Sequence, residues 1–450
     1  MKQGDLIPIK IIDLNTNGEG VGRVDNQVVF VPDTVTGDTI QARITQVKAK
    51  YALASLHKII VPSQHRIRPR CIVADKCGGC QWQHIDEAYQ REAKQQQVVQ
   101  TLQRIGGFND LVVEPILHTG NSLNYRNKST YPIKRSQTGK VQAGYYRKGS
   151  HKIVNLNQCP VQDDRLDPLL KEIKEDIYYQ GWTIYDETSY QGQLRHLSLR
   201  MGTHTGEMLL TLVATDDKLP YLERQAQEWL QRYPNLKGVC LNLNSDRTNA
   251  IFGRETITIA GQPDLKEIFA GIELRILAHT FFQINTIAAE MLLDTIVRQL
   301  KLKGSEVLVD AYCGIGTFTL PLAKLVKQAI GIESLADSVI QAQHNAKINQ
   351  IDNARFVTGK VATCLQKLEI EPDIIILDPP RKGCNPQVIE SLLRIRAPKI
   401  VYISCKPATL ARDLKLLVNS GIYQLKFLRS ADFFPQTTHV ETVAILEKSD

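Results

Sequence analysis

Residues 307–318 read Val-Leu-Val-Asp-Ala-Tyr-Cys-Gly-Ile-Gly-Thr-Phe. The apolar, β-branched start is typical of a buried strand, and apolar residues recur at helical spacing after Phe318. Between strand and helix, Gly314 and Gly316 permit a tight turn in which backbone N–H groups can approach a ligand. A dinucleotide-binding fingerprint would place a third glycine at position 319, and this chain has Thr319 there. The stretch predicts a strand–turn–helix unit of an α/β sheet, with a ligand at the turn.

Two more apolar strands end in acidic residues. Residues 329–333 read Ala-Ile-Gly-Ile-Glu, which places Glu333 at the distance expected for a ribose-binding carboxylate. Residues 374–383 read Ile-Ile-Ile-Leu-Asp-Pro-Pro-Arg-Lys-Gly, so this strand ends at Asp378 and two prolines fix the backbone beyond it. Combined with the Gly-x-Gly turn, this is the layout of an S-adenosylmethionine site. We therefore expect a Rossmann-like domain over residues 263–450.

A cysteine ends a further strand. Residues 400–409 read Ile-Val-Tyr-Ile-Ser-Cys-Lys-Pro-Ala-Thr, and Pro407 stops regular pairing just after Cys405. Open α/β sheets place their chemistry at the carboxyl ends of the strands, so Cys405 is a candidate nucleophile. A packed core thiol is the alternative, and it is the commoner fate of a cysteine.

Three segments together resemble the RNA 5-methyluridine (uracil-5-) methyltransferase family. They are Asp-Pro-Pro-Arg-x-Gly at 378–383, Val-Tyr-x-Ser-Cys at 401–405, and Asp-Phe-Phe-Pro-Gln-Thr-Thr-His-Val-Glu at 432–441. The resemblance implies an enzyme that methylates C5 of a uridine in RNA through a covalent adduct between a cysteine and C6 of the uracil. It implies Cys405 as the nucleophile and Glu441 as the base that removes the C5 proton.

The same resemblance implies the residues that hold S-adenosylmethionine, namely Gln283, Tyr312, Glu333 and Asp378. For Asp378, a role nearer the methyl group or the uracil edge is equally open. We expect residues 438–443 to form a strand with His439 and Glu441 on one face, so that His439 could orient or replace Glu441.

The length, net charge and cysteine count limit the class of protein and where in the cell it can act. The chain has 450 residues, enough for two or three domains, and a formal charge of +8, which fits a nucleic-acid partner without demanding one. No apolar run is long enough to span a bilayer and no signal-peptide core is present, so we expect a cytoplasmic monomer without membrane contact. Nine cysteines, an odd number, make a disulfide framework unlikely.

Residues 1–62 predict a small β-barrel of oligonucleotide-binding type, because short apolar runs alternate with glycine-rich turns such as residues 15–20. The run Gly-Glu-Gly-Val-Gly-Arg at 18–23 resembles the opening of a TRAM domain, which implies RNA binding. A folded module with only a solvated lysine face is the alternative.

Residues 63–262 predict a central α+β domain that contains a cysteine cluster. Cys71, Cys77 and Cys80 are closely spaced, and Cys159 is a possible fourth ligand. From spacing alone, an iron–sulfur cluster, a zinc ion and no metal all remain open. The resemblance supplies these four cysteines at matching positions and implies a 4Fe-4S cluster. Tyrosines interleaved with cations at 125–128 and 144–149 are suited to RNA contact, although ordinary sheets contain such runs too.

Several alternatives stay open. The TRAM-like module and the four cysteines resemble the branch that modifies 23S ribosomal RNA, so we favour ribosomal RNA, with the T-loop uridine of transfer RNA as the alternative. An amino-group methyltransferase would also use Asp-Pro-Pro but would need no cysteine. Lys406 stands where relatives usually have Asn, and it could tune the Cys405 thiol, contact an RNA phosphate, or face solvent.

Overall fold

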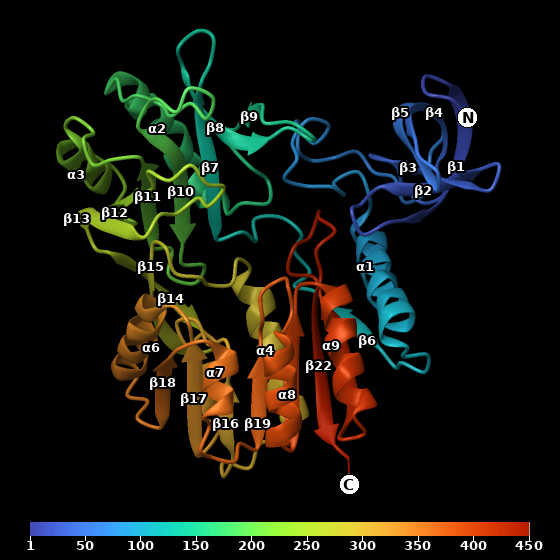
Figure 1. Cartoon of the computed structure of the whole chain (residues 1–450). Coiled ribbons are helices and arrows are strands. Elements are labelled where there is room, and N and C mark those ends of the chain that lie inside the picture. The colour runs from blue at the N-terminus through green and yellow to red at the C-terminus, as the bar shows by residue number, and fades with distance from the viewer. Residues whose placement is uncertain (450) are drawn as a thin grey trace.

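The computed structural model describes residues 1–449, which form a barrel, a central sheet and a larger C-terminal sheet (Figure 1). The barrel and the central sheet lie side by side above the same end of the C-terminal sheet. No helix in the described part of the chain is long and apolar enough to cross a membrane.

The N-terminal unit is a closed β-barrel, as the sequence predicts, and its five strands follow the order β1-β2-β3-β5-β4. One strand was not predicted: Gly20–Val24 pairs as β2, directly after the turn expected at residues 15–20. A Cβ at Gly22 would collide with the Ile9 side chain, so this strand passes too close to β1 for any larger residue. The barrel strands are β1 (Leu6–Leu14), β2 (Gly20–Val24), β3 (Gln27–Val31), β4 (Thr39–Val47) and β5 (Tyr51–Val61).

The central unit is a seven-stranded sheet in the order β13-β12-β11-β10-β7-β8-β9. The helices α2 (Asp167–Tyr179) and α3 (Leu222–Arg232) bury their apolar faces against it, around Trp182 and Trp229. The strands are β7 (Lys128–Arg135), β8 (Val141–Tyr146), β9 (Ile153–Asn155), β10 (Leu194–Met201), β11 (Met208–Ala214), β12 (Leu236–Leu243) and β13 (Glu255–Gly261), and a 3-10 turn (Asp164–Leu166) precedes α2.

The C-terminal sheet has eight strands in the order β18-β17-β16-β19-β20-β22-β21-β6. Strands β18 to β20 run parallel, whereas β22 is antiparallel to both β20 and β21. The strands are β6 (Glu114–Leu117), β16 (Val307–Asp310), β17 (Gln328–Glu333), β18 (Ala354–Thr358), β19 (Ile374–Leu377), β20 (Lys399–Ser404), β21 (Tyr423–Ala431) and β22 (Glu441–Lys448). The helices are α4 (Thr286–Leu300), α5 (Thr319–Ala323), α6 (Ala336–Ile348), α7 (Val361–Gln366), α8 (Pro386–Ile395) and α9 (Pro407–Asn419).

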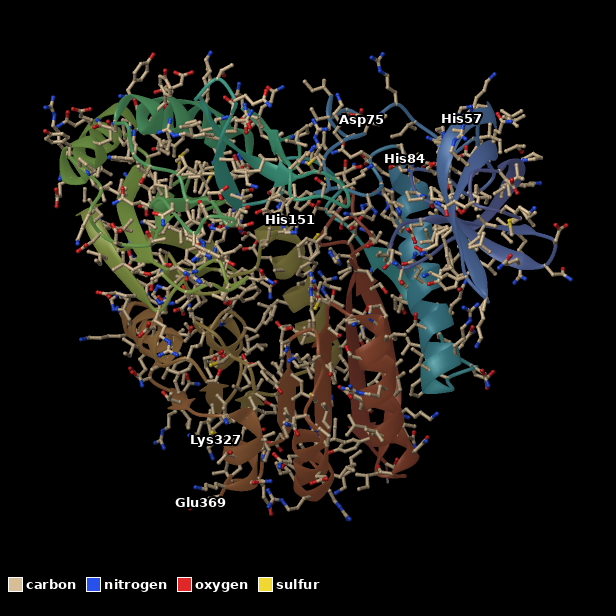
Figure 2. The ribbon with its side chains drawn as sticks, turned by 45° about the horizontal axis from the view of Figure 1, so that its top comes forward. His57, Asp75, His84, His151, Lys327 and Glu369 are labelled. Atoms are coloured by element: carbon tan, nitrogen blue, oxygen red, sulfur yellow. The ribbon has the colours of Figure 1, made fainter. Side chains whose placement is uncertain are left out.

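The orientation of this sheet turns the carboxyl ends of its parallel strands toward the rest of the molecule. In Figure 2, Lys327 and Glu369 mark the outer end, and Lys327 directly precedes β17. The carboxyl ends of the parallel strands therefore point the other way, toward the central sheet and the barrel that carries His57. Open α/β sheets bind their ligands at this edge.

One segment that precedes the central sheet in the chain belongs to the C-terminal sheet in space. Helix α1 (Glu87–Thr101), which ends in a π-helical turn (Leu102–Gly106), packs Val98 and Leu102 into the core beside α9. Strand β6 then pairs in parallel with β21 and becomes the edge of the sheet. Residues 87–117, assigned above to the central domain, thus complete the C-terminal sheet.

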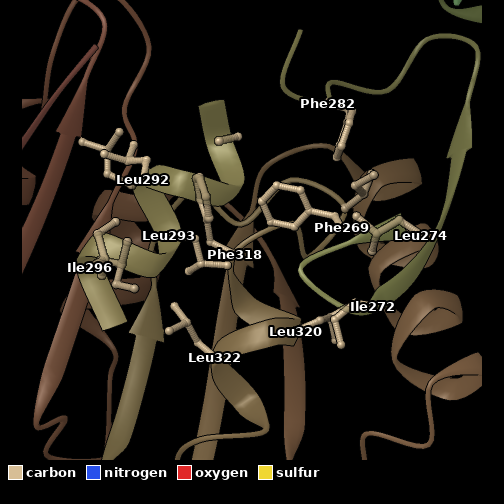
Figure 3. Packing of buried hydrophobic residues seen from close by; sticks show 14 of the residues in the cluster. Phe269, Ile272, Leu274, Phe282, Leu292, Leu293, Ile296, Phe318, Leu320 and Leu322 are labelled. Atoms are coloured by element: carbon tan, nitrogen blue, oxygen red, sulfur yellow. The ribbon is translucent and has the colours of Figure 1, made fainter. Parts of the chain in front are cut away.

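The segment that leads into α4 is held by a dense apolar core. The hairpin of β14 (Asp264–Phe269) and β15 (Ile272–Leu277) packs Phe269 edge-on against both Phe282 and Phe318 (Figure 3). Phe282 directly precedes Gln283, so this packing fixes the backbone that carries a predicted site residue.

Candidate active site

Five predicted site residues meet at the inner edge of the C-terminal sheet. Tyr312 follows β16, Glu333 ends β17, Asp378 follows β19 and Cys405 follows β20. Glu441 begins β22, and because this strand runs antiparallel its first residue lies at the same edge. Each of these side chains thus lies at or next to the end of an apolar strand, and the pairing of the strands brings them to one edge of the sheet.

Cys405, Asp378 and Glu441 form a desolvated, acidic cluster. Burial, followed by the charges of Glu441 and Asp378, raises the pKa of the Cys405 thiol to about 11. Burial and the nearby Asp310 raise the pKa of Asp378 to about 7. Burial and Asp378 hold the pKa of Glu441 well above its usual range. A carboxyl group whose pKa approaches neutrality is suited to accept and return protons.

The cation that acts on this cluster is Arg381, in the Asp-Pro-Pro-Arg run. It lowers the pKa of Cys405 and that of Glu441, against the effect of burial. Lys406 has a different environment: its side chain is exposed, while its backbone N–H donates to Ser404 Oγ at 3.1 Å in the turn that starts α9. From the sequence, Lys406 was the candidate for tuning the Cys405 thiol, because it is the next residue. Arg381 was missed, because only the fold places it near the thiol.

The four residues expected to hold the methyl donor divide into two pairs. Gln283 Nε2 donates to Asp378 Oδ2 at 3.4 Å, beside the cysteine. Its backbone carbonyl accepts from Asn127 Nδ2 at 2.8 Å, which ties it to the central sheet. The cap of α4 is Asn285, whose side chain accepts from Ala288 N, so the Gln283 side chain is free for the site.

Tyr312 and Glu333 line a separate cavity of about 370 Å³. The Glu333 carboxylate accepts from the backbone N–H of Gly314 at 3.2 Å and from that of Leu335 at 2.9 Å, and so links the Gly-x-Gly turn to the start of α6. The volume suits a small nucleoside-like ligand. The remaining lining residues include Lys360, Thr363, Asn385 and Gln387.

One local expectation is wrong. The strand begins at Glu441, which pairs with Ala431 across β21, so His439 lies in the preceding loop and not on a shared strand face. The His439 N–H donates to Thr437 Oγ1, and its ring lies edge-on to Phe434 at 5.9 Å. Burial lowers the pKa of His439, which favours its neutral form.

Comparison with known proteins agrees with this geometry. Residues 90–449 match the family described as tRNA (Uracil-5-)-methyltransferase, and residues 1–57 match the TRAM domain. The chain belongs to the tRNA (uracil-5-)-methyltransferase family. The family predicted from the three motif segments, and the TRAM-like barrel, are thereby confirmed.

Relatives extend over nearly the whole chain. An uncharacterized RNA methyltransferase of Nostoc sp. is 61% identical over 99% of this chain and 96% of its own length. One of Synechocystis sp. is 57% identical over the same shares. The crystal structure of Pyrococcus abyssi tRNA (uracil-54, C5)-methyltransferase in complex with S-adenosyl-L-homocysteine aligns with a TM-score of 0.79 at 27% identity, covering 98% of this chain and 100% of that one. The protein is therefore an RNA methyltransferase.

The methyltransferase also brings its four predicted cysteines to one place. A single cavity of about 90 Å³, formed by residues 71–83 and by residues of the central domain, is lined by Cys71, Cys77, Cys80 and Cys159. Within residues 1–449, no three His, Cys, Asp or Glu side chains are arranged to hold one metal ion as they stand. The thiols therefore surround a common space without converging on one point.

The chemistry of the cavity fits an anionic group held by thiolates. Burial raises the pKa of Cys80 to about 12 and that of Cys159 to about 11, so without a cation these thiols stay protonated. Arg126 also lines the cavity, and its Nε is buried without a hydrogen-bond partner. A guanidinium N–H that lacks an acceptor suits a neighbour with negative charge, as metal-bound thiolates provide.

Two of the three tyrosines expected to stack on RNA, Tyr125 and Tyr145, make contacts inside the protein. Tyr125 is buried, and its hydroxyl donates to the Pro435 carbonyl at 3.0 Å. The Tyr145 hydroxyl donates to Ser129 Oγ at 3.2 Å, and its ring packs against Tyr131. These rings build the wall of the cysteine cavity, which a sequence pattern of aromatics and cations does not distinguish from an RNA-binding surface.

Proposed function

We propose that this enzyme methylates C5 of a uridine in RNA, with S-adenosylmethionine as the donor, through a covalent bond between Cys405 and C6 of the uracil. The observation that carries the proposal is the placement of Cys405 with Glu441 and Asp378 at one sheet edge. A methyltransferase acting on an exocyclic amino group would need no thiol there.

Uracil C5 is a poor nucleophile, and covalent catalysis divides the difficult step in two. The Cys405 thiol loses its proton to a carboxylate of the acidic cluster, and the thiolate adds to C6, which leaves an enolate that is nucleophilic at C5. Bound S-adenosylmethionine would supply the methyl group: C5 would gain it as the sulfonium S–CH3 bond breaks, and S-adenosyl-L-homocysteine would be the leaving group. Glu441 then takes the proton from C5, the C6–S bond breaks, and the double bond returns as Cys405 leaves.

The donor and the uracil require separate places, and the two residue pairs fit this need. Tyr312 and Glu333 line the cavity of about 370 Å³, where a carboxylate suits two ribose hydroxyls. Asp378 and Gln283 lie beside the thiol, which favours a role for Asp378 at the methyl group or at the uracil edge.

We favour ribosomal RNA as the substrate, because the chain combines a TRAM domain with four cysteines around one cavity. Transfer RNA is the second candidate, since the Pyrococcus abyssi structure is that of a tRNA (uracil-54, C5)-methyltransferase. Methylation of 23S ribosomal RNA and of transfer RNA transcripts by the purified protein, compared side by side, separates the two.

We propose a 4Fe-4S cluster on Cys71, Cys77, Cys80 and Cys159. The four cysteines line one cavity, and both a 4Fe-4S cluster and a zinc ion accept four thiolates, so the choice of the cluster rests on the resemblance to the family. Protein purified without oxygen should be brown and contain about four irons per chain. Colourless protein with one zinc would overturn this assignment.

The covalent step has a direct test. RNA containing 5-fluorouridine should trap wild-type protein as a stable adduct, because fluorine at C5 cannot leave as a proton, and Cys405→Ala should form none. Glu441→Gln should form the adduct with ordinary RNA and release it slowly. Adducts that form equally with Cys405→Ala would refute Cys405 as the nucleophile.

A further inference from the structure

The loop 432–440 joins β21 to β22 and directly precedes Glu441. Two side chains of helix α1 form hydrogen bonds with residues of this loop. We propose that Gln90 and Lys94 of α1 are positioning residues for Glu441, acting through this loop. The inference rests on the proposed role of Glu441 as the base. It assigns a catalytic purpose to a helix that lies more than 330 residues earlier in the chain.

Within the part of the chain that the structure describes, the Glu441 side chain is not fixed by hydrogen bonds of its own. Among residues 1–449, no hydrogen bond reaches its carboxylate, and its side chain is only 8% exposed. Its backbone pairs with Ala431, and the next residue, Thr442, pairs with Ser404 beside the nucleophile. The direction of its carboxyl group therefore depends on the backbone on the loop side, where regular pairing has ended.

Lys94 anchors the first half of the loop. Its side chain is fully buried, and Nζ donates to Asp432 Oδ1 at 2.6 Å and to the Phe434 carbonyl at 3.0 Å. A buried ammonium retains its charge only with such partners, so the pair fixes both residues in one arrangement. The ion pair thus ties α1 to the residue that directly follows β21.

Gln90, one turn earlier on α1, anchors the second half. Its Oε1 accepts from the Gln436 N–H at 2.9 Å, and its Nε2 donates to Gln436 Oε1 at 3.1 Å. Gln436 has a left-handed backbone with φ of 69°, a conformation that a non-glycine residue keeps only when its surroundings hold it. The backbone amides of Gln81 and Trp82 both donate to the Gln436 carbonyl and hold it further. The contacts of Gln90 and Lys94 with the loop 432–440 are called the clamp below.

The same helix has an attachment that does not involve the loop. Gln97 Nε2 donates to the Asn15 carbonyl of the barrel at 3.1 Å. Gln97→Ala therefore removes a contact of α1 of similar kind and leaves the clamp on the loop intact. It is a matched control for the clamp variants.

The test compares Gln90→Leu and the double variant Lys94→Met/Asp432→Asn with Gln97→Ala and wild type. The double variant removes both charges, so no buried charge is left unpaired. In both clamp variants we expect adduct formation with 5-fluorouridine RNA at the wild-type rate, because Cys405 is untouched. With ordinary RNA, the covalent complex should accumulate and kcat should fall about tenfold to a hundredfold with KM unchanged, as expected for a misplaced base. Gln97→Ala should behave like wild type.

The outcomes separate the positioning role from the proposed function. If wild type forms no adduct that depends on Cys405, the proposed chemistry is wrong. If wild type forms the adduct but the clamp variants lose attack and release in parallel, or lose both as their melting temperatures fall, the clamp is merely structural and the inference is overturned. Clamp variants that release product at the wild-type rate would overturn it as well.

Discussion

Removing the Arg381 charge should slow every reaction of the Cys405 thiolate, whereas removing the charge of the adjacent Lys406 should not. Arg381 lowers the pKa of Cys405, while burial and the charges of Glu441 and Asp378 raise it. Lys406 follows Cys405 directly in the chain, but its side chain is exposed. Arg381→Gln removes a charge that lies near the thiol in the fold, whereas Lys406→Gln removes a charge that is adjacent only in the sequence. Comparing the two variants therefore tests which charge acts on Cys405.

The size of the effect follows from the thiol's surroundings. The pKa of Cys405 rises from its ordinary value of 9.0 to about 11, so at pH 8 about one thiol in a thousand is ionised. Arg381 is exposed and water screens its charge, so its loss should raise the pKa by about half a unit to one unit. The thiolate fraction, and the rate of attack at fixed pH, should fall about threefold to tenfold.

Alkylation by iodoacetamide measures this fraction without RNA or cofactor. The rate at Cys405 is followed by peptide mass spectrometry at several pH values, with Cys364 as an internal reference. In wild type the rate should rise about tenfold per pH unit up to pH ~10, without a plateau near neutrality. Equal slowing by Lys406→Gln, or no slowing by Arg381→Gln, would refute this electrostatic assignment.

Three further predictions concern stability and the cysteine cavity. Burial raises the pKa of Asp38, but the Arg66 side chain and backbone N–H groups hold this pKa below its usual value, so the pair should stabilise the fold above pH ~4. Asp38→Ala should cost about 3 kcal/mol at pH 7 in denaturant titrations, and this cost should shrink as the pH falls below ~4. Gly22→Ala should destabilise the barrel by about 1–3 kcal/mol in the same assay, because the added Cβ meets the Ile9 side chain. Lys174 Nζ donates to Asn157 Oδ1 at 2.7 Å, two residues before Cys159, so Lys174→Met should speed the loss of bound metal to a chelator while the same variant binds RNA normally.

The sequence predicts the strand ends of the C-terminal sheet because the signals for them are local. The strands that end at Glu333, Asp378 and Cys405 are apolar runs stopped by polar residues or proline, and parallel strands bring such ends together. The Gly-x-Gly turn after β16 is predicted by an equally local signal, since Gly314 and Gly316 have φ of 54° and 86°, a backbone conformation that favours glycine.

What the sequence does not reveal depends on contacts between distant segments. Strand β6 pairs with β21, which lies more than 300 residues later in the chain. A strand of four residues is too short for its hydrophobic pattern to indicate which strand it pairs with. Strand β2 was hidden because glycines usually mark turns, whereas here they allow two barrel strands to pass closely. Arg381 and the clamp on loop 432–440 were missed for the same reason, because their partners are set by tertiary packing.

The most direct test of the central claim is a nucleoside analysis of methylated RNA. Purified wild type and Cys405→Ala are incubated with unmodified 23S ribosomal RNA and transfer RNA and with isotopically labelled S-adenosylmethionine, and the digested nucleosides are identified by mass spectrometry. We expect labelled 5-methyluridine from the wild type, at one position of one RNA class, and none from Cys405→Ala. Label in a nucleoside methylated on an amino group, or equal 5-methyluridine from both proteins, would contradict the account.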